Sequence, residues 1–327
     1  MKKDISVFSS IGRKSGFDVI IGTHSGIFHA DEVVAISLLK LYHEEQKLAV
    51  VRSRTLEELS KCNILVDIGG GKFDHHQPGG NGARKNGIHY ASAGLIWKEF
   101  GEGIVVNLTN KAEFKLDAFQ ISTVTSKIDD FYIQRVDEID NGVPCDDDVF
   151  SYISAFLPDW NHSSDVAFNK AFLEVVEVTT TILNKLIRKA IEEEYSFSWV
   201  ISSIAKNHQR IFELPAQTFP WQEPILLCNG CYYQPIDFVI FPYPAGGWAA
   251  QCVPPSAAMP FAQRIPFPKS WAGQTDNLPE ISGIPKATFC HNNCFFARAD
   301  TKEAVIKMCE KAIEIFENSK KSDNSEK

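Results

Sequence analysis

The chain has 327 residues, a formal net charge of −8 and a hydrophobic content of 44%, which fits a globular protein of about two domains. The acidic balance argues against a surface coated with basic residues for non-specific nucleic-acid binding. No apolar run approaches the roughly 20 residues of a membrane-spanning helix, and residues 1–17 lack the apolar stretch of a secretory signal, so we expect a cytoplasmic protein without a membrane partner.

Short apolar runs separated by a helical pattern characterise the first part of the chain. We predict buried strands at residues 19–21, 48–51 and 64–66, because each is a short run of aliphatic residues. Residues 31–42 predict a helix, since apolar residues recur after an acidic start. This alternation indicates an α/β domain with a mainly parallel sheet flanked by helices.

Metal-binding side chains gather just beyond two of these strands. Parallel strands end at one edge of a sheet, where such folds place their sites. Imidazole and carboxylate donors suit a hard or borderline divalent cation such as Mn²⁺. The sequence therefore predicts a metal centre at this edge. Its candidate residues are His24, His29 and Asp31 after the first strand, and Asp67, Asp74, His75 and His76 after the third.

The next segments predict a loop and then helices. Residues 78–90 are rich in Gly and Asn, which is typical of an exposed, mobile loop. A helix is expected from residue 91, capped by Ser92 and ending before Gly101. Residues 116–140 are predicted to be mainly helical.

An acidic pair closes that helical segment. Asp137 and Asp140 are one turn apart and could share a face. We prefer Asp140 as a further metal ligand, because it stands where the helix gives way to Asn-Gly, and Asp137 is the alternative. The remaining interpretation is that both are solvated acids of a helix surface.

The second half of the chain changes character. Residues 164–194 predict a long connecting helix. Short β-rich runs then predict a smaller α/β domain built around a sheet, and residues 302–318 predict a closing helix. The β-rich runs are residues 199–201, 225–228, 238–241 and 248–253. We expect a metal-binding domain at residues 1–165, a linker helix at 166–198 and a C-terminal domain at 199–327.

Eight cysteines are scattered along the chain and form no disulfide framework. Cys228 and Cys231 make a C-x-x-C sequence that could join Cys290 and Cys294 in a zinc site. We favour a β-hairpin that turns at the intervening Asn-Gly dipeptide.

The motifs around the candidate donors resemble those of the melanocyte-proliferating-gene (MYG-type) proteins of the DHH phosphoesterase superfamily. The resemblance covers nearly the whole chain and rests on residues 22–32, 66–70, 74–77 and 137–142. It implies an N-terminal DHH-type domain that holds two divalent ions, usually Mn²⁺ or Mg²⁺, and hydrolyses phosphoester bonds. Eukaryotic members are described as RNA exonucleases that work from the 3′ end.

The resemblance also implies roles for the donors. One ion would be held by His24, His29 and Asp31; Asp67 would bridge; and His75, Asp140 and Asp74 would hold the second. His76 would bind metal or donate to the scissile phosphate. One departure is His29, which stands where related pyrophosphatases and phosphodiesterases carry aspartate. A neutral ligand in place of an anionic one leaves the site more electropositive, which alters metal preference.

Residues of the C-terminal domain resemble family motifs that meet substrate. They are Gly246, Gly247, Arg264, Trp271 and His291. Glycines let backbone approach a ligand, Arg264 could pair with phosphate, Trp271 offers a face to a base, and His291 is a hydrogen-bond donor. Core packing explains Trp271 equally well. In the first domain, Arg54 resembles an arginine that could reach substrate, with a solvated surface arginine as the alternative.

We therefore expect a metal-dependent phosphoesterase, most specifically a 3′–5′ exonuclease on RNA or short oligonucleotides. The acidic net charge does not oppose this, because several acids are candidate ligands and bound cations change the local sign. One alternative is a small-phosphate hydrolase, either an inorganic pyrophosphatase or a phosphodiesterase of oligonucleotides or cyclic dinucleotides. Another is a non-catalytic metal- or nucleotide-binding protein. The oligomeric state is open, with a homodimer among the options.

Overall fold

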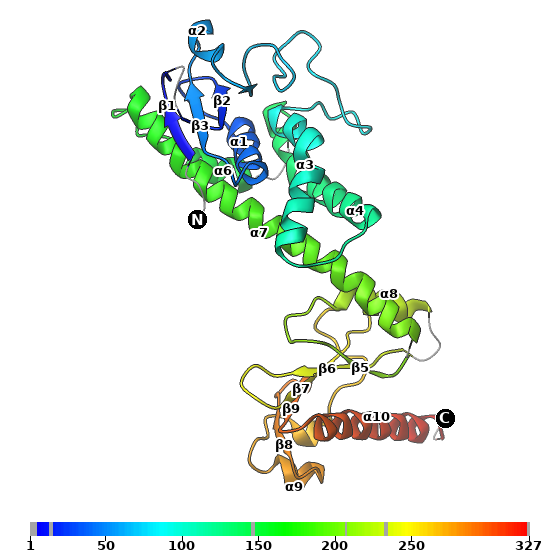
Figure 1. Cartoon of the computed structure of the whole chain (residues 1–327). Helices are drawn as coiled ribbons and strands as arrows, with labels where there is room; N and C mark the ends of the chain where they lie inside the picture. The colour runs from blue at the N-terminus through cyan, green and yellow to red at the C-terminus, as the bar shows by residue number, and fades with distance from the viewer. Residues whose placement is uncertain (1–4, 13–15, 145–147, 207, 232–234, 326–327) are drawn as a thin grey trace. The chain divides into compact units, whose positions relative to one another are not determined.

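The computed structural model describes residues 5–12, 16–144, 148–206, 208–231 and 235–325. The chain forms two compact units, residues 1–195 and residues 196–327 (Figure 1). We call them the N-terminal and C-terminal units. Each contains its own sheet and its own helices, so the expected α/β class is confirmed. Within the described residues, we find no helix with the length and apolar character needed to cross a membrane.

The N-terminal unit contains a four-stranded parallel sheet. Its order is β1-β3-β2-β4, and the strands are β1 (Ile5–Phe8), β2 (Val19–Thr23), β3 (Leu48–Arg52) and β4 (Ile64–Leu65). Every residue of β3 is buried, as its mainly apolar run requires for a strand covered on both faces. The three predicted strands and their parallel pairing are confirmed.

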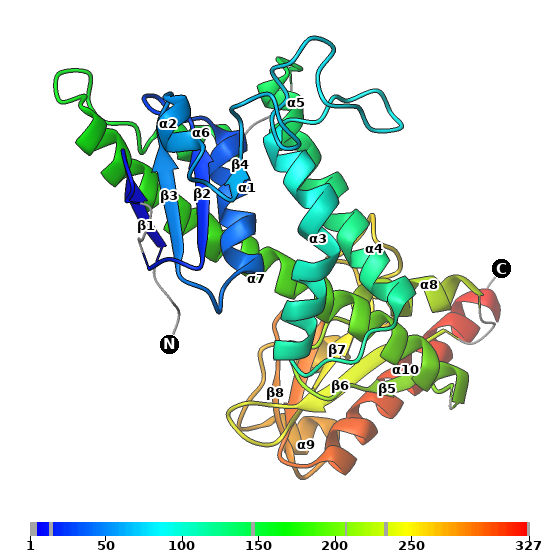
Figure 2. The same ribbon diagram turned by 45° about the horizontal axis from the view of Figure 1, so that its top comes forward.

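The helices of this unit lie beside the sheet and pack on one another (Figure 2). They are α1 (Ala30–Tyr42), α2 (Leu56–Leu59), α3 (Ser92–Lys111), α4 (Ala118–Ile128), the π-helix η1 (Asp129–Ile133), α5 (Gln134–Asp140) and α6 (Asp148–Ser154). Helix α3 packs against α1, and α4 packs against α3. One apolar core joins β2 and β3 to α1, α3, α4 and the N-terminal part of α7 (Asp165–Lys206). Since α1 is buried almost throughout, its first turn is held firmly at the edge of the sheet.

Two predictions about α3 are wrong. The residue that precedes its first turn is Ala91, which has no side-chain cap, and Ser92 is already helical. The helix also continues past Gly101 to Lys111. A Cβ on Gly101 would lie 2.7 Å from the Trp97 ring, so the glycine gives room to a packed indole and does not stop the helix.

The long helix α7 was predicted to end near residue 194 but continues to Lys206. Its residues up to Tyr195 belong to the N-terminal unit and the rest to the C-terminal unit. The predicted strand at 199–201 is therefore wrong. Val200 and Ile204 recur four residues apart and are both buried in the C-terminal unit, which is helical rather than strand spacing.

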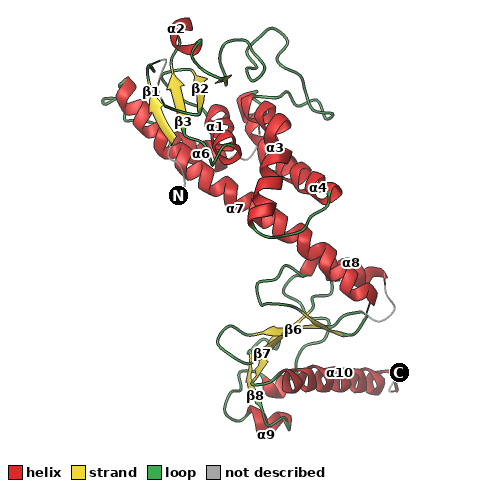
Figure 3. Cartoon of the chain, viewed as in Figure 1, coloured by secondary structure: helices red, strands yellow, loops and turns green. Residues whose placement is uncertain are grey.

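The C-terminal unit contains a five-stranded sheet of order β5-β6-β7-β9-β8 (Figure 3). The strands are β5 (Ile211–Glu213), β6 (Phe238–Pro242), β7 (Trp248–Cys252), β8 (Ala287–Cys290) and β9 (Phe296–Ala299). The pair β5 and β6 is parallel, and the other pairs are antiparallel. The strands predicted at 238–241 and 248–253 are confirmed.

Different helices cover the two faces of this sheet. They are α8 (Gln222–Cys231), the 3-10 helix η2 (Lys269–Trp271), α9 (Leu278–Ser282) and α10 (Lys302–Ser325). One core lies between the sheet and α10 and includes Val305, Met308 and Cys309. A second core lies on the opposite face and includes Ile225 and Cys228 of α8.

The hairpin predicted at the C-x-x-C sequence is wrong, because α8 contains Cys228, Cys231 and the whole β-rich run at 225–228. The cysteines of the alternative zinc site do not lie together either. Cys228 belongs to the core on one face of the sheet, whereas Cys290 and Cys294 belong to the core on the other.

Candidate metal centre

The first donors come from the junction of β2 and α1. His24 follows directly on β2, and His29 immediately precedes α1. Asp31 and Glu32 lie in the first turn of α1 and are completely buried. The Glu32 carboxylate accepts the backbone N–H of His29 at 2.8 Å, which closes the start of the helix. The sequence therefore presents these side chains from a strand end and a helix start, both fixed by the core.

Asp67 lies at the centre of the donors. It follows β4 in a left-handed backbone conformation with φ 58°, which is uncommon for a residue with a side chain and is characteristic of functional sites. Ser92 Oγ donates to Asp67 Oδ1 at 3.3 Å. The carboxylate is buried, and it joins donors from both sides of the site.

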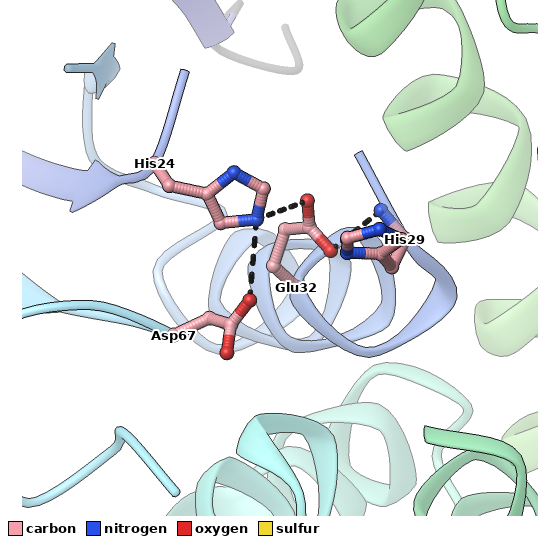
Figure 4. Close-up of side chains that lie close together, drawn as sticks. All are labelled: His24, His29, Glu32 and Asp67. Atoms are coloured by element: carbon pink, nitrogen blue, oxygen red, sulfur yellow. Dashed lines mark hydrogen bonds and ion pairs between the residues drawn. The ribbon is translucent and has the colours of Figure 1, made fainter. Parts of the chain in front are cut away.

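The first group of donors consists of His24, His29, Glu32 and Asp67 (Figure 4). His24 Nε2 lies 3.2 Å from Asp67 Oδ2 and 3.1 Å from Glu32 Oε1. The side chain of Glu32 points toward His24 in the same view. Glu32 was not predicted as a ligand, although its position beside Asp31 in the first turn of a predicted helix was visible in the sequence.

Two further groups share Asp67 or its neighbours. They are Asp67 with His75 and His76, and Asp31 with His75 and Asp140. His75 Nε2 lies 3.2 Å from Asp67 Oδ1 and 3.1 Å from Asp140 Oδ2. Its distance from Asp31 Oδ2 is 3.8 Å. In each of the three groups, one donor atom per residue lies within 4.8 Å of the others.

The geometry separates Asp140 from Asp137. Asp140 is the last residue of α5 and faces His75. Asp137 is fully buried elsewhere, where its carboxylate accepts the backbone N–H of Gly94 at 2.9 Å and forms an ion pair with Arg84. Arg84 also pairs with Asp129 at 2.7 Å. Asp137 therefore ties the 78–90 loop to the helices, and only Asp140 lies among the donors.

Asp74 lies beside the donor groups and belongs to none of them. Its Oδ2 accepts the N–H of Gly70 at 2.6 Å, and its Oδ1 accepts the backbone N–H of His76 at 3.1 Å. The same Oδ1 lies 2.9 Å from His76 Nδ1. These contacts hold Asp74 beside Gly70 and His76, outside the three donor groups. The His76 ring is largely exposed, at 64% of its side chain.

The cluster contains an excess of buried carboxylates. Both carboxylate oxygens of Asp31 are buried without a hydrogen-bond partner. Burial and the neighbouring Asp67 charge raise the pKa of Asp31. Burial raises the pKa of Glu32 to about 8 and that of Asp140 to about 7. Buried carboxylates are costly unless they are paired or coordinate a metal, so these residues fit divalent cations with oxygen and imidazole ligands.

The pKa values of two histidines are raised by the same carboxylates. Burial lowers the pKa of His24, but hydrogen bonds with Asp67 and Glu32 outweigh it and raise the pKa to about 10. The pKa of His75 is likewise lowered by burial, and raised to about 9 overall by Asp67 and Asp140. These imidazoles respond to an excess of negative charge, which a bound cation would balance.

Two arginines lie next to the first group. Arg54 is exposed, and its Nη2 lies 3.4 Å from His24 Nδ1. Arg52 is 1% exposed, donates to Gly26 O at 2.7 Å, and stacks on Phe172 with its central carbon 4.5 Å from the ring centroid. Arg52 therefore fixes the loop between His24 and His29, whereas Arg54 is exposed beside His24.

The predicted residues of the C-terminal unit do not gather at one place. Gly246 and Gly247 form the turn between β6 and β7 with φ 97° and 75°, and a Cβ on Gly247 would lie 2.5 Å from Ala299 O. Arg264 lies at the other end of these strands, where its N–H donates to Val253 O at 3.0 Å. Strands of five residues are about 17 Å long, so the glycine pair and Arg264 are well separated.

Arg264 and Trp271 have clear local environments. Arg264 Nε lies 3.5 Å from the buried Asp237 Oδ1, and the side chain lines a cavity of about 360 Å³ together with Arg210 and Lys320. Trp271 is 1% exposed and stacks on Phe267 with ring centroids 6.2 Å apart. It has no free face for a base, so of the two predicted roles the structure supports core packing. His291 is half-buried at the end of β8 and accepts the N–H of Asn293 at 3.1 Å.

The parallel sheet of the N-terminal unit and the histidine and carboxylate groups at its edge define an α/β protein with a candidate site for divalent metal ions. Comparison with known proteins gives the family. Residues 20–313 match the model named MYG1_exonuc, described as "Uncharacterised protein family (UPF0160)". The chain belongs to this MYG1 exonuclease family.

Relatives from distant organisms support the assignment. The chain is 30% identical over 332 residues to the MYG1 exonuclease of Homo sapiens, covering 88% of this chain and 84% of the relative. It is 29% identical over 326 residues to the MYG1 protein C694.04c of Schizosaccharomyces pombe, covering 92% and 99%. It is 30% identical over 335 residues to the MYG1 protein of Dictyostelium discoideum, covering 90% and 97%.

Among solved structures, a match is found with RecJ in complex with Mn²⁺ from Thermus thermophilus. The identity is 12%, the TM-score is 0.24, and the match covers 90% of this chain. The chain spans about half the length of that structure, at 51%. A TM-score this low supports no detailed structural comparison, and the family assignment rests on the sequence relatives.

Proposed function

We propose that this protein is a metal-dependent 3′–5′ exonuclease that acts on RNA or short oligonucleotides at the centre described above. The observation that carries the proposal is the position of the Asp67 carboxylate. Its Oδ2 lies 3.2 Å from His24 and its Oδ1 lies 3.2 Å from His75. One carboxylate shared between two groups of donors is the arrangement that a pair of divalent cations requires, and the relatives named exonucleases support a phosphodiester substrate.

Candidate ligands divide between the two sides of Asp67. On one side are His24, His29 and Glu32, and on the other are Asp31, His75 and Asp140. Two cations bound there, with Mn²⁺ favoured over Mg²⁺, would lower the pKa of a shared water and offset charge on the phosphate oxygens. The protein's own part is to hold the donors rigidly, which the buried first turn of α1 and the strained Asp67 backbone support.

His76 and Arg54 would act on the substrate itself. Because Nδ1 of His76 faces Asp74, the other ring nitrogen is the one available to donate a proton or hydrogen bond toward the scissile phosphate. Arg54 is exposed beside His24, and its guanidinium can make paired hydrogen bonds to a second phosphate. In the C-terminal unit, Arg264 offers phosphate contacts at its cavity, and Gly246, Gly247 and His291 remain candidate substrate contacts.

The experiment is a substrate panel on the purified full chain. Single-stranded RNA labelled at the 5′ or the 3′ end, inorganic pyrophosphate, a dinucleotide and a cyclic dinucleotide would be incubated with Mn²⁺, Mg²⁺ or EDTA. The expected result is stepwise shortening of 5′-labelled RNA with Mn²⁺ or Mg²⁺ and no turnover with EDTA. Preferential cleavage of pyrophosphate or the small nucleotides would favour the small-phosphate hydrolase instead.

A matched pair of variants connects the activity to the site. Asp140→Asn removes a candidate ligand, whereas Asp130→Asn makes the same change at an exposed aspartate of η1. Loss of turnover in the first with retention in the second is expected. Metal binding without turnover on any substrate would favour the non-catalytic alternative. The cytoplasmic location, the domain roles and a homodimer stay predictions.

A further inference from the structure

The C-terminal sheet carries a cluster of half-buried aromatic rings, of which the proposed function uses only His291. The face under α10 is filled by buried residues such as Ala250, Cys252 and Ala297. On the opposite face, α8 and the end of α7 pack over residues of β5, β6 and β7. Phe289 of β8 and Phe296 of β9 lie on that second face, and the remaining rings lie in the turn between β8 and β9 or just after β6. We call the whole set the aromatic platform. Its rings are Tyr243, Phe289, His291, Phe295 and Phe296.

The rings of the aromatic platform contact one another in series. Phe296 is the central ring, with centroids 6.1 Å from Tyr243, 6.4 Å from Phe289 and 6.2 Å from Phe295. His291 lies 4.5 Å from Phe295 and 6.4 Å from Phe289. These separations, with rings tilted or edge-on to one another, are typical of favourable aromatic pairs. The rings therefore form one continuous surface and not isolated side chains.

Core packing accounts for only part of this cluster. Tyr243 and Phe296 pack against the core on that face. Phe289 and Phe295 belong to none of the buried apolar clusters formed by the described residues. All five rings keep an intermediate exposure. A protein gains most from an aromatic ring by burying it fully, so half-open rings outside the core indicate a binding surface.

Arg298 gives this surface a positive charge. It lies on β9 directly opposite Phe289 of β8, and its guanidinium carbon is 3.9 Å from the Tyr243 ring centroid. Its Nη2 donates to Gly246 O at 3.4 Å, while its Nε is buried and has no hydrogen-bond partner. Within the described residues, no carboxylate lies within ion-pairing distance of Arg298. An arginine that is stacked on a ring and lacks a counter-ion is suited to an anionic, planar ligand.

We propose that the aromatic platform and Arg298 bind the unpaired bases of a single-stranded nucleic acid. Aromatic side chains and arginine on an open sheet face are the means by which proteins hold successive bases, because every base has a π-face. The platform would hold about two or three bases, and Arg298 would pair with a phosphate between them. This inference rests on the proposed function in taking the substrate to be a nucleic acid, and it gives Tyr243 and Phe289 the stacking role that the buried Trp271 cannot have.

The test measures binding in the absence of turnover. Fluorescence polarisation of a 5′-fluorescein-labelled oligouridylate would be recorded with the full chain in EDTA, at fixed salt, for wild type, Tyr243→Leu, Phe289→Leu, Arg298→Lys and Arg298→Met. Leucine keeps apolar volume and removes the π-face. Phe261→Leu is the matched control, because Phe261 is 93% exposed and lies outside the platform. Circular dichroism would confirm that each variant is folded.

The expected result is affinity about 10-fold lower for each leucine variant, in line with the loss of one stacked base. Arg298→Met should weaken binding more than Arg298→Lys, and Phe261→Leu should bind as wild type does. A duplex of the same length should bind more weakly than the single strand, since its bases are already stacked. Leucine variants that bind within about twofold of wild type, or a wild-type chain that does not bind the single strand, would overturn the proposal.

Hydrolysis distinguishes this proposal from the proposed function. The same variants would be assayed with Mn²⁺ on bis-p-nitrophenyl phosphate, which has no nucleobase. If the platform variants hydrolyse that small diester at the wild-type rate but have a raised KM for RNA, both the proposed function and the aromatic platform are supported. If no variant and no wild-type sample hydrolyses any phosphodiester while the binding differences persist, the proposed function fails and the aromatic platform stands. If the wild-type chain hydrolyses phosphodiesters and the platform variants bind RNA with wild-type affinity, the proposed function stands and the aromatic platform is overturned.

Discussion

His75 Nε2 lies 3.1 Å from Asp140 Oδ2, which joins the loop after β4 to the last residue of α5. No local spacing relates these two residues. This contact completes the donor group of Asp31, His75 and Asp140, and it explains why Asp140 belongs to the site while Asp137, one helical turn earlier, does not. The relationship makes the proposed centre testable at the level of single carboxylates.

Metal removal should lower stability. Because the cluster holds several buried carboxylates, Mn²⁺ or Mg²⁺ that binds the folded state alone would stabilise it by about 2.7 kcal/mol at a concentration about 100 times the dissociation constant. Thermal unfolding in EDTA and with added metal measures this effect. Asp140→Asn should reduce the metal-induced rise in Tm, and Asp130→Asn should keep it. Equal rises in both variants would place the metal elsewhere.

Asp74 should act through His76. In Asp74→Asn, the new side chain keeps one acceptor oxygen, and its NH2 group cannot accept, so it can no longer accept from both the Gly70 N–H and the His76 N–H. The loop and His76 would therefore lose their orientation. We expect RNA hydrolysis to fall by about 10- to 100-fold, as for residues that orient a metal site, with metal content unchanged by elemental analysis. Glu99→Gln, at a surface carboxylate paired with Lys72, is the control. Loss of metal along with activity would make Asp74 a ligand after all.

Arg84 should be a stability residue. Its side chain is 7% exposed and pairs with the buried Asp137 and with Asp129. Arg84→Met would leave the Asp137 charge buried and unpaired, which costs about 3–5 kcal/mol of the free energy of unfolding. Denaturant unfolding measures the loss, and Asp137→Asn added to Arg84→Met should recover part of it. The exposed neighbour change Lys85→Met should have little effect, and a similar loss there would contradict the ion-pair explanation.

Trp271 should matter for the core and not for RNA. The indole is 1% exposed within the core under α10, so Trp271→Ala should lower the free energy of unfolding by about 3–5 kcal/mol. Trp160→Ala removes an indole that is 90% exposed and should leave stability almost unchanged. For Trp271→Phe, which keeps most of the packing, affinity for the labelled oligouridylate should equal that of wild type. Weaker binding of the oligouridylate by Trp271→Phe would indicate that the Trp271 indole contacts RNA after all.

The sequence by itself determined the parallel sheet of the N-terminal unit and most of the candidate donors. Runs such as 19–21 and 48–51 are too short and too apolar for surface elements, and parallel strands bring their carboxyl ends to one edge. His24, Asp67 and His75 follow from that reasoning alone. The family was also visible in the motifs, and the comparisons confirm it.

Only the tertiary structure decided which polar groups were already satisfied. Asp74 and Asp137 have the same side chain as Asp67 and Asp140, but they contact backbone N–H groups and Arg84 and lie outside the three donor groups. Glu32 joined the donors because α1 buries it beside His24. The strand predicted at 199–201 and the hairpin predicted at the C-x-x-C sequence are wrong for a related reason. Short apolar runs fit a strand and a buried helix equally well, and the choice depends on long-range packing that local spacing does not encode.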